Sequence, residues 1–150
     1  MDQQHPSPSR WAIVLAGGEG TRMQPLVHRC LGFNRPKQYC AFVGSRSMFQ
    51  HTVDRAALVT APERIVAVVG RDHRDEILTQ LQGRTIGQVI YQPRNCETAA
   101  GLFLPLTYIH ARAPDATVVI FPSDHFIHPE DRFLKAVCRI AEPAETLPDR

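Results

Sequence analysis

Four short apolar runs alternate along this 150-residue chain with segments whose apolar residues recur at helical spacing. The runs are residues 12–16, 65–69, 88–91 and 117–121. A short continuous apolar run is typical of a strand that is buried on both faces of a parallel sheet. The alternation therefore predicts right-handed βαβ crossovers and an α/β fold, with a mostly parallel sheet between layers of helices.

Local signals place the expected helices between these strands. Ser47 is a good N-cap, and Pro129 fits the first position of the last helix. The stretch from Thr98 to Ala111 is apolar and helical in pattern, but Pro105 inside it would cost about 3 kcal/mol in a regular helix. We therefore expect a kink or a break at Pro105. Residues 27–33 show no clear periodicity, which favours a loop.

Composition limits the classes of function. The net charge of +2 is spread without a basic run, which argues against nucleic acid or an anionic membrane surface as a partner. No apolar run approaches the ~20 residues needed to span a bilayer. Four cysteines without a C-x-x-C pair, and no signal peptide, favour a reduced, cytoplasmic compartment. Residues 1–10 are expected to be a flexible lead-in, and residues 11–150 to form one domain.

A glycine-rich turn follows the first apolar run directly. Its backbone amides can form an anion-binding concavity, because glycine has no Cβ and tolerates positive φ. The residues of this candidate phosphate loop are Ala16, Gly17, Gly18, Glu19, Gly20 and Thr21. Arg22 and Lys37 could add full positive charges. The turn matches neither the P-loop nor the dinucleotide fingerprint, so a plain tight turn with solvated cations is the alternative interpretation.

Two further clusters follow the third and fourth expected strands. Ligands of open α/β sheets bind beyond the carboxyl ends of the strands, where such clusters would meet. Gln92 and Asn95 carry amides that can read a base edge or a ribose, whereas Thr98 could simply cap the following helix. Asp124 suits Mg²⁺, which is held by one or two carboxylates together with phosphates and waters. The alternative role for Asp124 is to cap the turn before the last helix.

Four motifs in order, LAGGEGTRMQPL, PKQY, QPRNCETAAG and FPSDHF, resemble those of the sugar-phosphate nucleotidyltransferases, in particular the mannose-1-phosphate guanylyltransferase branch. The resemblance implies a Rossmann-like, GT-A-like three-layer sandwich. It also implies Mg²⁺-assisted formation of an NDP-sugar and pyrophosphate from a nucleoside triphosphate, GTP by this branch, and a sugar 1-phosphate.

The resemblance also implies roles for individual residues. The loop from Gly17 to Arg22 would wrap the nucleotide phosphates, with Arg22 stabilising the leaving pyrophosphate. Lys37 would neutralise charge near the α-phosphorus, and Asp124 would hold the metal. The residues expected along the nucleoside are Gln92, Asn95 and Thr98.

The chain departs from the family pattern in three ways. The segment of residues 27–35 is longer than the usual connection, and Cys96 and Glu97 replace the residues commonly found before the Thr-Ala pair. Family members also continue into a sugar-binding half with a second metal-binding aspartate, so we expect a sheet that is incomplete at its C-terminal end.

Three hypotheses follow from these departures. The first is the nucleotide-binding half of a guanylyltransferase, inactive or nearly so in isolation. The second is a nucleotide-binding module without catalysis. The third is an enzyme completed by a partner chain or by a homo-oligomer.

Overall fold

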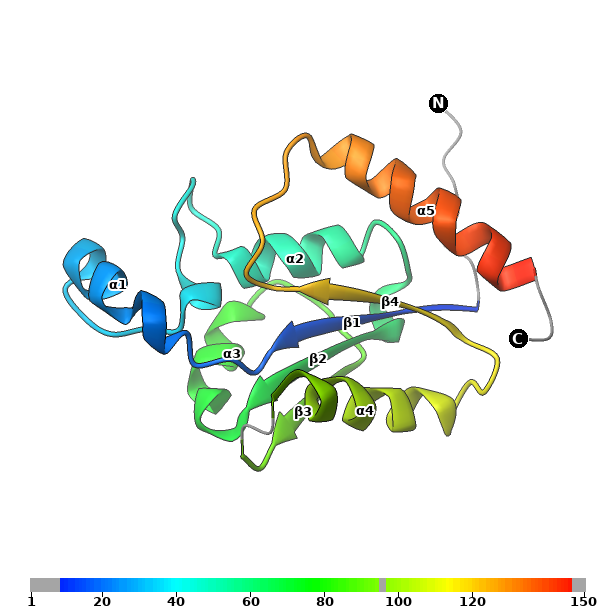
Figure 1. Ribbon diagram of the computed structural model, residues 1–150, viewed down its shortest axis with the longest axis horizontal. Coiled ribbons are helices and arrows are strands. Elements are labelled where there is room, and N and C mark those ends of the chain that lie inside the picture. The colour runs from blue at the N-terminus through cyan, green and yellow to red at the C-terminus, as the bar shows by residue number, and fades with distance from the viewer. Residues whose placement is uncertain (1–8, 95–96, 147–150) are drawn as a thin grey trace.

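The computed structural model describes residues 9–94 and 97–146. Its four strands are β1 (Arg10–Ala16), β2 (Ile65–Gly70), β3 (Gln88–Gln92) and β4 (Thr117–Pro122). They form one sheet in the order β3-β2-β1-β4, and every pair of neighbours is parallel (Figure 1). The predicted α/β fold with a parallel sheet is confirmed.

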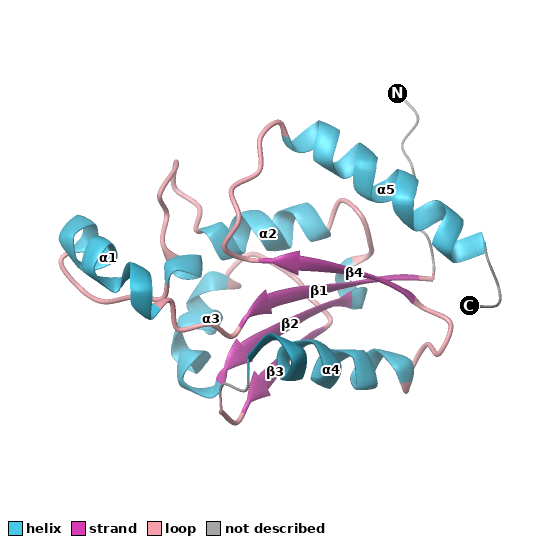
Figure 2. Ribbon diagram, viewed as in Figure 1, coloured by secondary structure: helices cyan, strands magenta, loops and turns pink. Residues whose placement is uncertain are grey.

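Helices cover both faces of the sheet, which gives three layers (Figure 2). The helices are α1 (Gln24–Leu31), α2 (Met48–Ala56), α3 (Arg74–Gln80), α4 (Glu97–His110) and α5 (Glu130–Thr146). Side chains of α2, α3 and α5 pack on one face, and those of α4 pack on the other. The central strand β1 is therefore buried on both sides, and Ile13 and Val14 are fully enclosed.

The helix starts follow from local chemistry. Ser47 forms a full capping box with Gln50 at the start of α2, which confirms the predicted cap. The helix α5 begins one residue after Pro129, so the predicted first helical position was off by one. The strand β1 begins at the buried Arg10, so Arg10 does not belong to the predicted lead-in. The rest of that lead-in, up to residue 8, lies outside the described residues.

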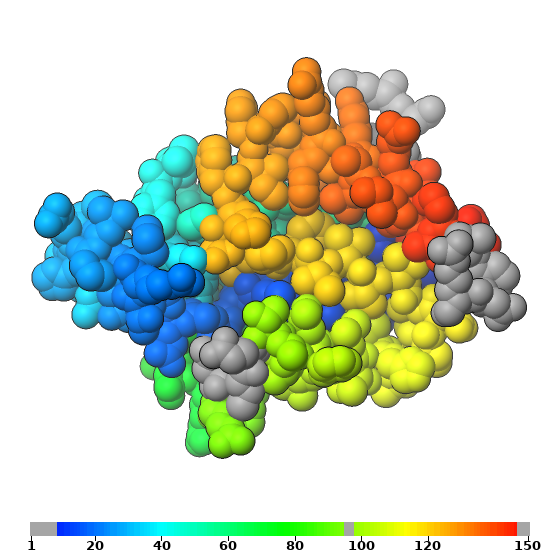
Figure 3. All heavy atoms as spheres, viewed as in Figure 1, coloured from blue at the N-terminus to red at the C-terminus, as the bar shows by residue number. Residues whose placement is uncertain are grey.

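Two further predictions concern α1 and α4. Residues 27–33 are not a loop, because α1 occupies residues up to Leu31 and Gly32 caps it in the left-handed conformation. The apolar residues Leu26, Val27, Cys30 and Leu31 recur at helical spacing over this short helix at the edge of the molecule (Figure 3), but only Val27 is buried. At Pro105 the prediction was a kink or a break. There is no break, since α4 runs through Pro105 and its residues Leu106 and Ile109 still pack against the sheet, and a kink stays a prediction.

Two buried arginines hold α5 against the body of the molecule. Arg55 on α2 donates from Nε to Oε1 of Glu130, at 2.8 Å, in the first turn of α5. Arg10 on β1 donates from Nε to Oε1 of Glu145, at 2.6 Å, near the other end of the helix. Both ends of α5 are thus fixed by ion pairs. Across the part of the chain described here, no helix has the length and apolar character to cross a bilayer.

Candidate functional site

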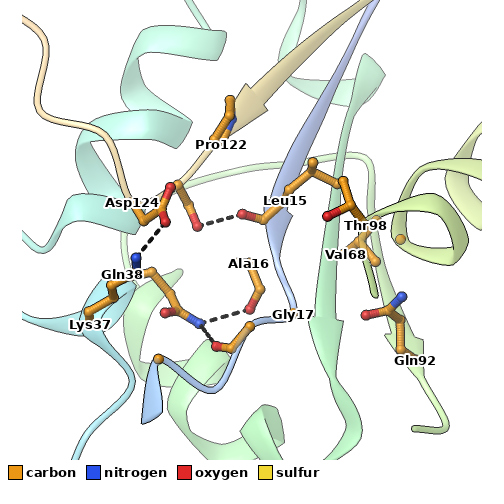
Figure 4. A pocket seen from close by; sticks show the side chains of 14 residues that line it. Leu15, Ala16, Gly17, Lys37, Gln38, Val68, Gln92, Thr98, Pro122 and Asp124 are labelled. Atoms are coloured by element: carbon orange, nitrogen blue, oxygen red, sulfur yellow. Dashed lines mark hydrogen bonds and ion pairs between the residues drawn. The ribbon is translucent and has the colours of Figure 1, made fainter. Parts of the chain in front are cut away.

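A pocket of about 390 Å³ lies at the carboxyl ends of the strands (Figure 4). Its lining comes from the ends of β1, β3 and β4 and from the segments that follow them in the chain. This is the usual place for a ligand site in a parallel sheet. The predicted residues that line it are Ala16, Gly17, Gly18, Gly20, Lys37, Gln92, Thr98 and Asp124. The structure therefore brings together residues that are more than 100 positions apart in the sequence.

Three predicted site residues that the structure describes do not line the pocket. Glu19, Thr21 and Arg22 are exposed, and Arg22 lies on a short 3-10 helix (Thr21–Met23) after the loop. Asn95 lies outside the described residues. The predicted meeting of the motifs at one edge of the sheet is thus confirmed for the eight residues that line the pocket. The role of Arg22 stays a prediction.

The glycines of the loop serve different purposes. Gly20 has φ of 63°, a left-handed conformation that suits glycine. Gly17 leaves room for Gln92 instead, because a Cβ at position 17 would force the side-chain oxygen of Gln92 to shift. Gly18 shows neither requirement, since no atom lies within 4 Å of the place its Cβ would take. Of the three glycines, only Gly20 uses the positive φ that glycine tolerates.

Side chains that the sequence analysis did not single out hold the loop in place. Gln38, which is 3% exposed, donates from Nε2 to the carbonyls of Ala16 at 3.0 Å and Gly18 at 2.7 Å. Ser123 donates from Oγ to the carbonyl of Leu15 at 2.6 Å. Both residues belong to the quoted motifs PKQY and FPSDHF, which is the one sequence signal that could have found them.

The buried Tyr39 also binds the start of this loop. The Tyr39 hydroxyl donates to the Ala16 carbonyl at 3.4 Å and lies 3.2 Å from Nδ1 of the buried His73. Burial raises the pKa of Tyr39, so its hydroxyl keeps its proton at neutral pH. The carbonyl at the end of β1 therefore has two neutral side-chain donors, Gln38 and Tyr39.

Lys37 and Asp124 meet across the pocket. Lys37 Nζ lies 2.7 Å from Asp124 Oδ2, and each side chain is about one third exposed, at 31% and 34%. Burial alone would raise the pKa of the Asp124 carboxyl, but the hydrogen bond and charge of Lys37, with the charge of His125, lower it. The carboxylate is therefore ionised at neutral pH. The pair is accessible to solvent and to a ligand in the pocket.

The donor set fits a magnesium ion that is shared with phosphates. Asp124 offers a hard, ionised oxygen that lines the pocket, and Mg²⁺ commonly takes only one or two protein carboxylates. In residues 9–94 and 97–146 there is no cluster of three or more His, Cys, Asp or Glu that could form a complete cage. A metal at Asp124 would therefore depend on ligand phosphates and water for its other bonds.

The far wall of the pocket comes from β3 and α4. Gln92 ends β3 and is 5% exposed, and its amide fits between Gly17 and Gly101. Thr98 lies in the first turn of α4, which begins at Glu97, so the alternative that Thr98 is the N-cap is wrong. Both residues line the pocket, and their contact with a nucleoside stays a prediction.

Comparison with known proteins agrees with this geometry. Residues 11–147 match the family model described as Nucleotidyl transferase. Over 135 residues the chain is 35% identical to the xanthan biosynthesis protein XanB of Xanthomonas campestris, which covers 89% of this chain and 28% of XanB. It is 30% identical over 127 residues to a mannose-1-phosphate guanylyltransferase of Salmonella montevideo, covering 83% of this chain and 26% of that enzyme.

A solved structure gives the same result. The protein described as mannose-1-phosphate geranyltransferase from Thermus thermophilus superposes with a TM-score of 0.73 at 25% identity, covering 92% of this chain and 39% of that one. The chain thus spans between about a quarter and two fifths of the length of these relatives. With its parallel sheet, its pocket at the strand ends and the match over residues 11–147, the chain belongs to the nucleotidyl transferase family.

Proposed function

We propose that this chain carries the nucleotide-binding part of an enzyme that makes GDP-mannose and pyrophosphate from GTP and mannose 1-phosphate. The observation that carries the proposal is the meeting of the glycine loop, Lys37 and Asp124 in one pocket. The similarity to a mannose-1-phosphate guanylyltransferase supports the choice of nucleotide and sugar. Both substrates carry phosphates, which suit a pocket with a cation, glycine amides and a metal-binding oxygen.

The reaction asks little covalent chemistry of the protein. A phosphate oxygen of the sugar 1-phosphate attacks the α-phosphorus of the nucleotide, and the bond to the β-phosphate oxygen breaks to release pyrophosphate. The attacking oxygen is already anionic, so no general base is required. Positioning and charge neutralisation carry the step.

The residues of the pocket divide this work. Loop amides from Gly17 to Gly20 bind the phosphates, and Lys37 leaves Asp124 to neutralise charge near the α-phosphorus. Asp124, once free of Lys37, holds Mg²⁺, which when bound withdraws charge from the phosphate oxygens. Gln92 and Thr98 lie along the nucleoside. Arg22 is proposed to turn inward and stabilise the pyrophosphate.

Calorimetry with GTP and MgCl₂ tests the binding part of the proposal. Wild-type protein should bind Mg-GTP, and Asp124→Ala should lose the dependence on magnesium. Absence of any binding by the folded wild type would contradict the proposal. Assays with mannose 1-phosphate over a range of protein concentrations test catalysis, since activity that rises faster than concentration indicates completion by self-association.

A nucleotide-binding module without catalysis is the second candidate. It is favoured by the position of Arg22, the cation proposed to stabilise the leaving pyrophosphate, which is exposed and does not line the pocket. Magnesium-dependent GTP binding that survives Asp124→Ala, with no turnover at any concentration, would favour this module over the transferase.

A further inference from the structure

The side chain of Gln38 has an unusual place in the pocket. It is buried to all but 3% of its surface, and its amide nitrogen donates to two carbonyls of the glycine loop, those of Ala16 and Gly18. These carbonyls lie on either side of Gly17, as Figure 4 shows with two dashed lines from the Gln38 amide. One side-chain amide thus binds two peptide units of the loop, the one between Ala16 and Gly17 and the one between Gly18 and Glu19.

The consequence follows from peptide geometry. A trans peptide unit is planar, and its C=O and N–H point in opposite directions. When the carbonyls of Ala16 and Gly18 turn toward Gln38, the N–H groups of Gly17 and Glu19 turn to the opposite side. The Ala16 carbonyl keeps a second donor in the Tyr39 hydroxyl, so loss of Gln38 would chiefly free the peptide unit between Gly18 and Glu19 to rotate, where glycine offers little steric resistance.

We propose that Gln38 is a positioning residue, which presets the amides of the glycine loop for the polyphosphate of the ligand. This inference rests on the proposed function and adds to it a named determinant of phosphate affinity. Gln38 acts through the backbone of the loop, and its own amide is occupied by the two carbonyls.

The chain segment that carries Lys37 is anchored independently of Gln38. Arg35 pairs with Glu76 of α3 through two contacts, Nε to Oε2 at 3.1 Å and Nη2 to Oε1 at 2.6 Å. This pair anchors the segment that precedes Lys37 without help from Gln38. A substitution at Gln38 should therefore disturb the loop more than the position of Lys37.

The test compares Gln38→Met with wild type, using inorganic tripolyphosphate and GTP as ligands in calorimetry with MgCl₂. Methionine keeps the length and burial of the side chain but cannot donate. The expected result is a loss of about tenfold in affinity for both ligands, from the cost of ordering the loop. A loss for GTP alone would show that Gln38 contacts the nucleoside, and unchanged affinity for both would overturn the proposal.

Gln50→Met is the matched control. Gln50 also makes two hydrogen bonds, accepting from the Ser47 amide and donating to the Gln80 carbonyl, but it does not line the pocket. It should leave tripolyphosphate affinity unchanged. An equal loss in Gln50→Met would overturn the proposal, because the effect would then be one of general loosening.

The double variant Lys37→Met with Gln38→Met tests whether Gln38 acts through the glycine loop or through Lys37. Independent action predicts that the two fold-losses multiply. If the double variant is no weaker than Lys37→Met alone, Gln38 acts through Lys37 and the proposal fails.

A measurement on the wild type covers the case in which Gln38→Met does not fold. The side-chain amide protons of Gln38 should exchange slowly with solvent, and should stay slow when tripolyphosphate is bound. Fast exchange in either state would overturn the proposal. If folded wild type binds neither tripolyphosphate nor GTP, the proposed function itself fails.

Discussion

Two ion pairs lie at opposite ends of the sheet, and their surroundings differ. Arg10 and Glu145 meet at the amino end of β1, with side chains only 6% and 11% exposed. Lys37 and Asp124 meet at the carboxyl end, where each side chain is about one third exposed, at 31% and 34%. The distances are nearly the same, 2.6 and 2.7 Å. Contact geometry alone therefore does not distinguish them.

Burial determines what each pair can do. Removing one partner of a buried pair leaves a charge without compensation, so such a pair cannot exchange its partners cheaply. An exposed pair contributes about 0–1 kcal/mol, because water replaces the lost contact. The first pair therefore suits holding α5 in place, and the second suits giving way to a charged ligand.

The largest expected effect is on stability at the buried end. Glu145→Gln should lower the free energy of unfolding by about 3 kcal/mol, because Arg10 keeps its charge in a buried position. Lys135→Met, which removes the exposed pair with Asp131 on the same helix, should cost less than about 0.5 kcal/mol. Urea unfolding measures both. Equal costs would show that burial does not separate these pairs.

The next largest effect is on ligand binding at the exposed pair of Lys37 and Asp124. Lys37→Met should weaken Mg-GTP binding by about 10- to 100-fold, the usual value of a hydrogen bond to a charged group. The free energy of unfolding should change by less than about 1 kcal/mol. Calorimetry and urea unfolding of the same preparation measure the two quantities. A large loss of stability with unchanged affinity would reverse the roles assigned to the two pairs.

A smaller effect should appear with pH. The pKa of Asp124 is lowered in the folded protein, so its ionised form stabilises the fold above the ordinary carboxyl pKa of about 3.9. That contribution is lost as the pH falls through the lowered pKa. Asp124→Asn should therefore be less stable than wild type near pH 7, by under about 1 kcal/mol, and equal to it at the acid end. A difference that widens toward low pH would contradict the direction of the shift.

The smallest effect is that of salt. Raising NaCl shortens the screening length, which is about 10 Å at 0.1 M, and weakens accessible pairs first. The stability cost of Lys37→Met should shrink toward zero in high salt, whereas that of Glu145→Gln should persist. Unfolding experiments at low and high NaCl compare the two. A salt-sensitive cost at Glu145 would mean that water reaches the Arg10 pair.

The strands and the meeting of the motifs could be predicted because they follow from short-range pattern and topology. The run of residues 65–69 is short, rich in β-branched residues and followed by Gly70, which favours a buried strand, and the observed β2 (Ile65–Gly70) differs from it by one residue. Parallel strands then bring their carboxyl ends to one edge, which places Asp124 near the glycine loop. No contact between side chains was needed for that inference.

The contacts themselves could not be predicted from the pattern. In the sequence Gln38 is an ordinary polar residue of a loop. Its hydrogen bonds go to carbonyls about 20 positions earlier in the chain, which no local pattern predicts. Arg10 and Glu145 are 135 positions apart, and each looks like a surface charge. The helix α1 is only eight residues long, with Leu26, Val27, Cys30 and Leu31 as its apolar residues, and so short a pattern does not by itself distinguish a helix from a loop. Tertiary packing decides all three.

The loop that carries Asp124 is fastened at both ends. Ser123 binds the Leu15 carbonyl at its start, and Glu130 binds the buried Arg55 at its finish. These two contacts tie both ends of the loop to the body of the molecule. If Asp124 binds a metal as proposed, rotation of its own side chain, which takes picoseconds to nanoseconds, is enough to release Lys37. We therefore expect ligand association to need no slow opening of this loop.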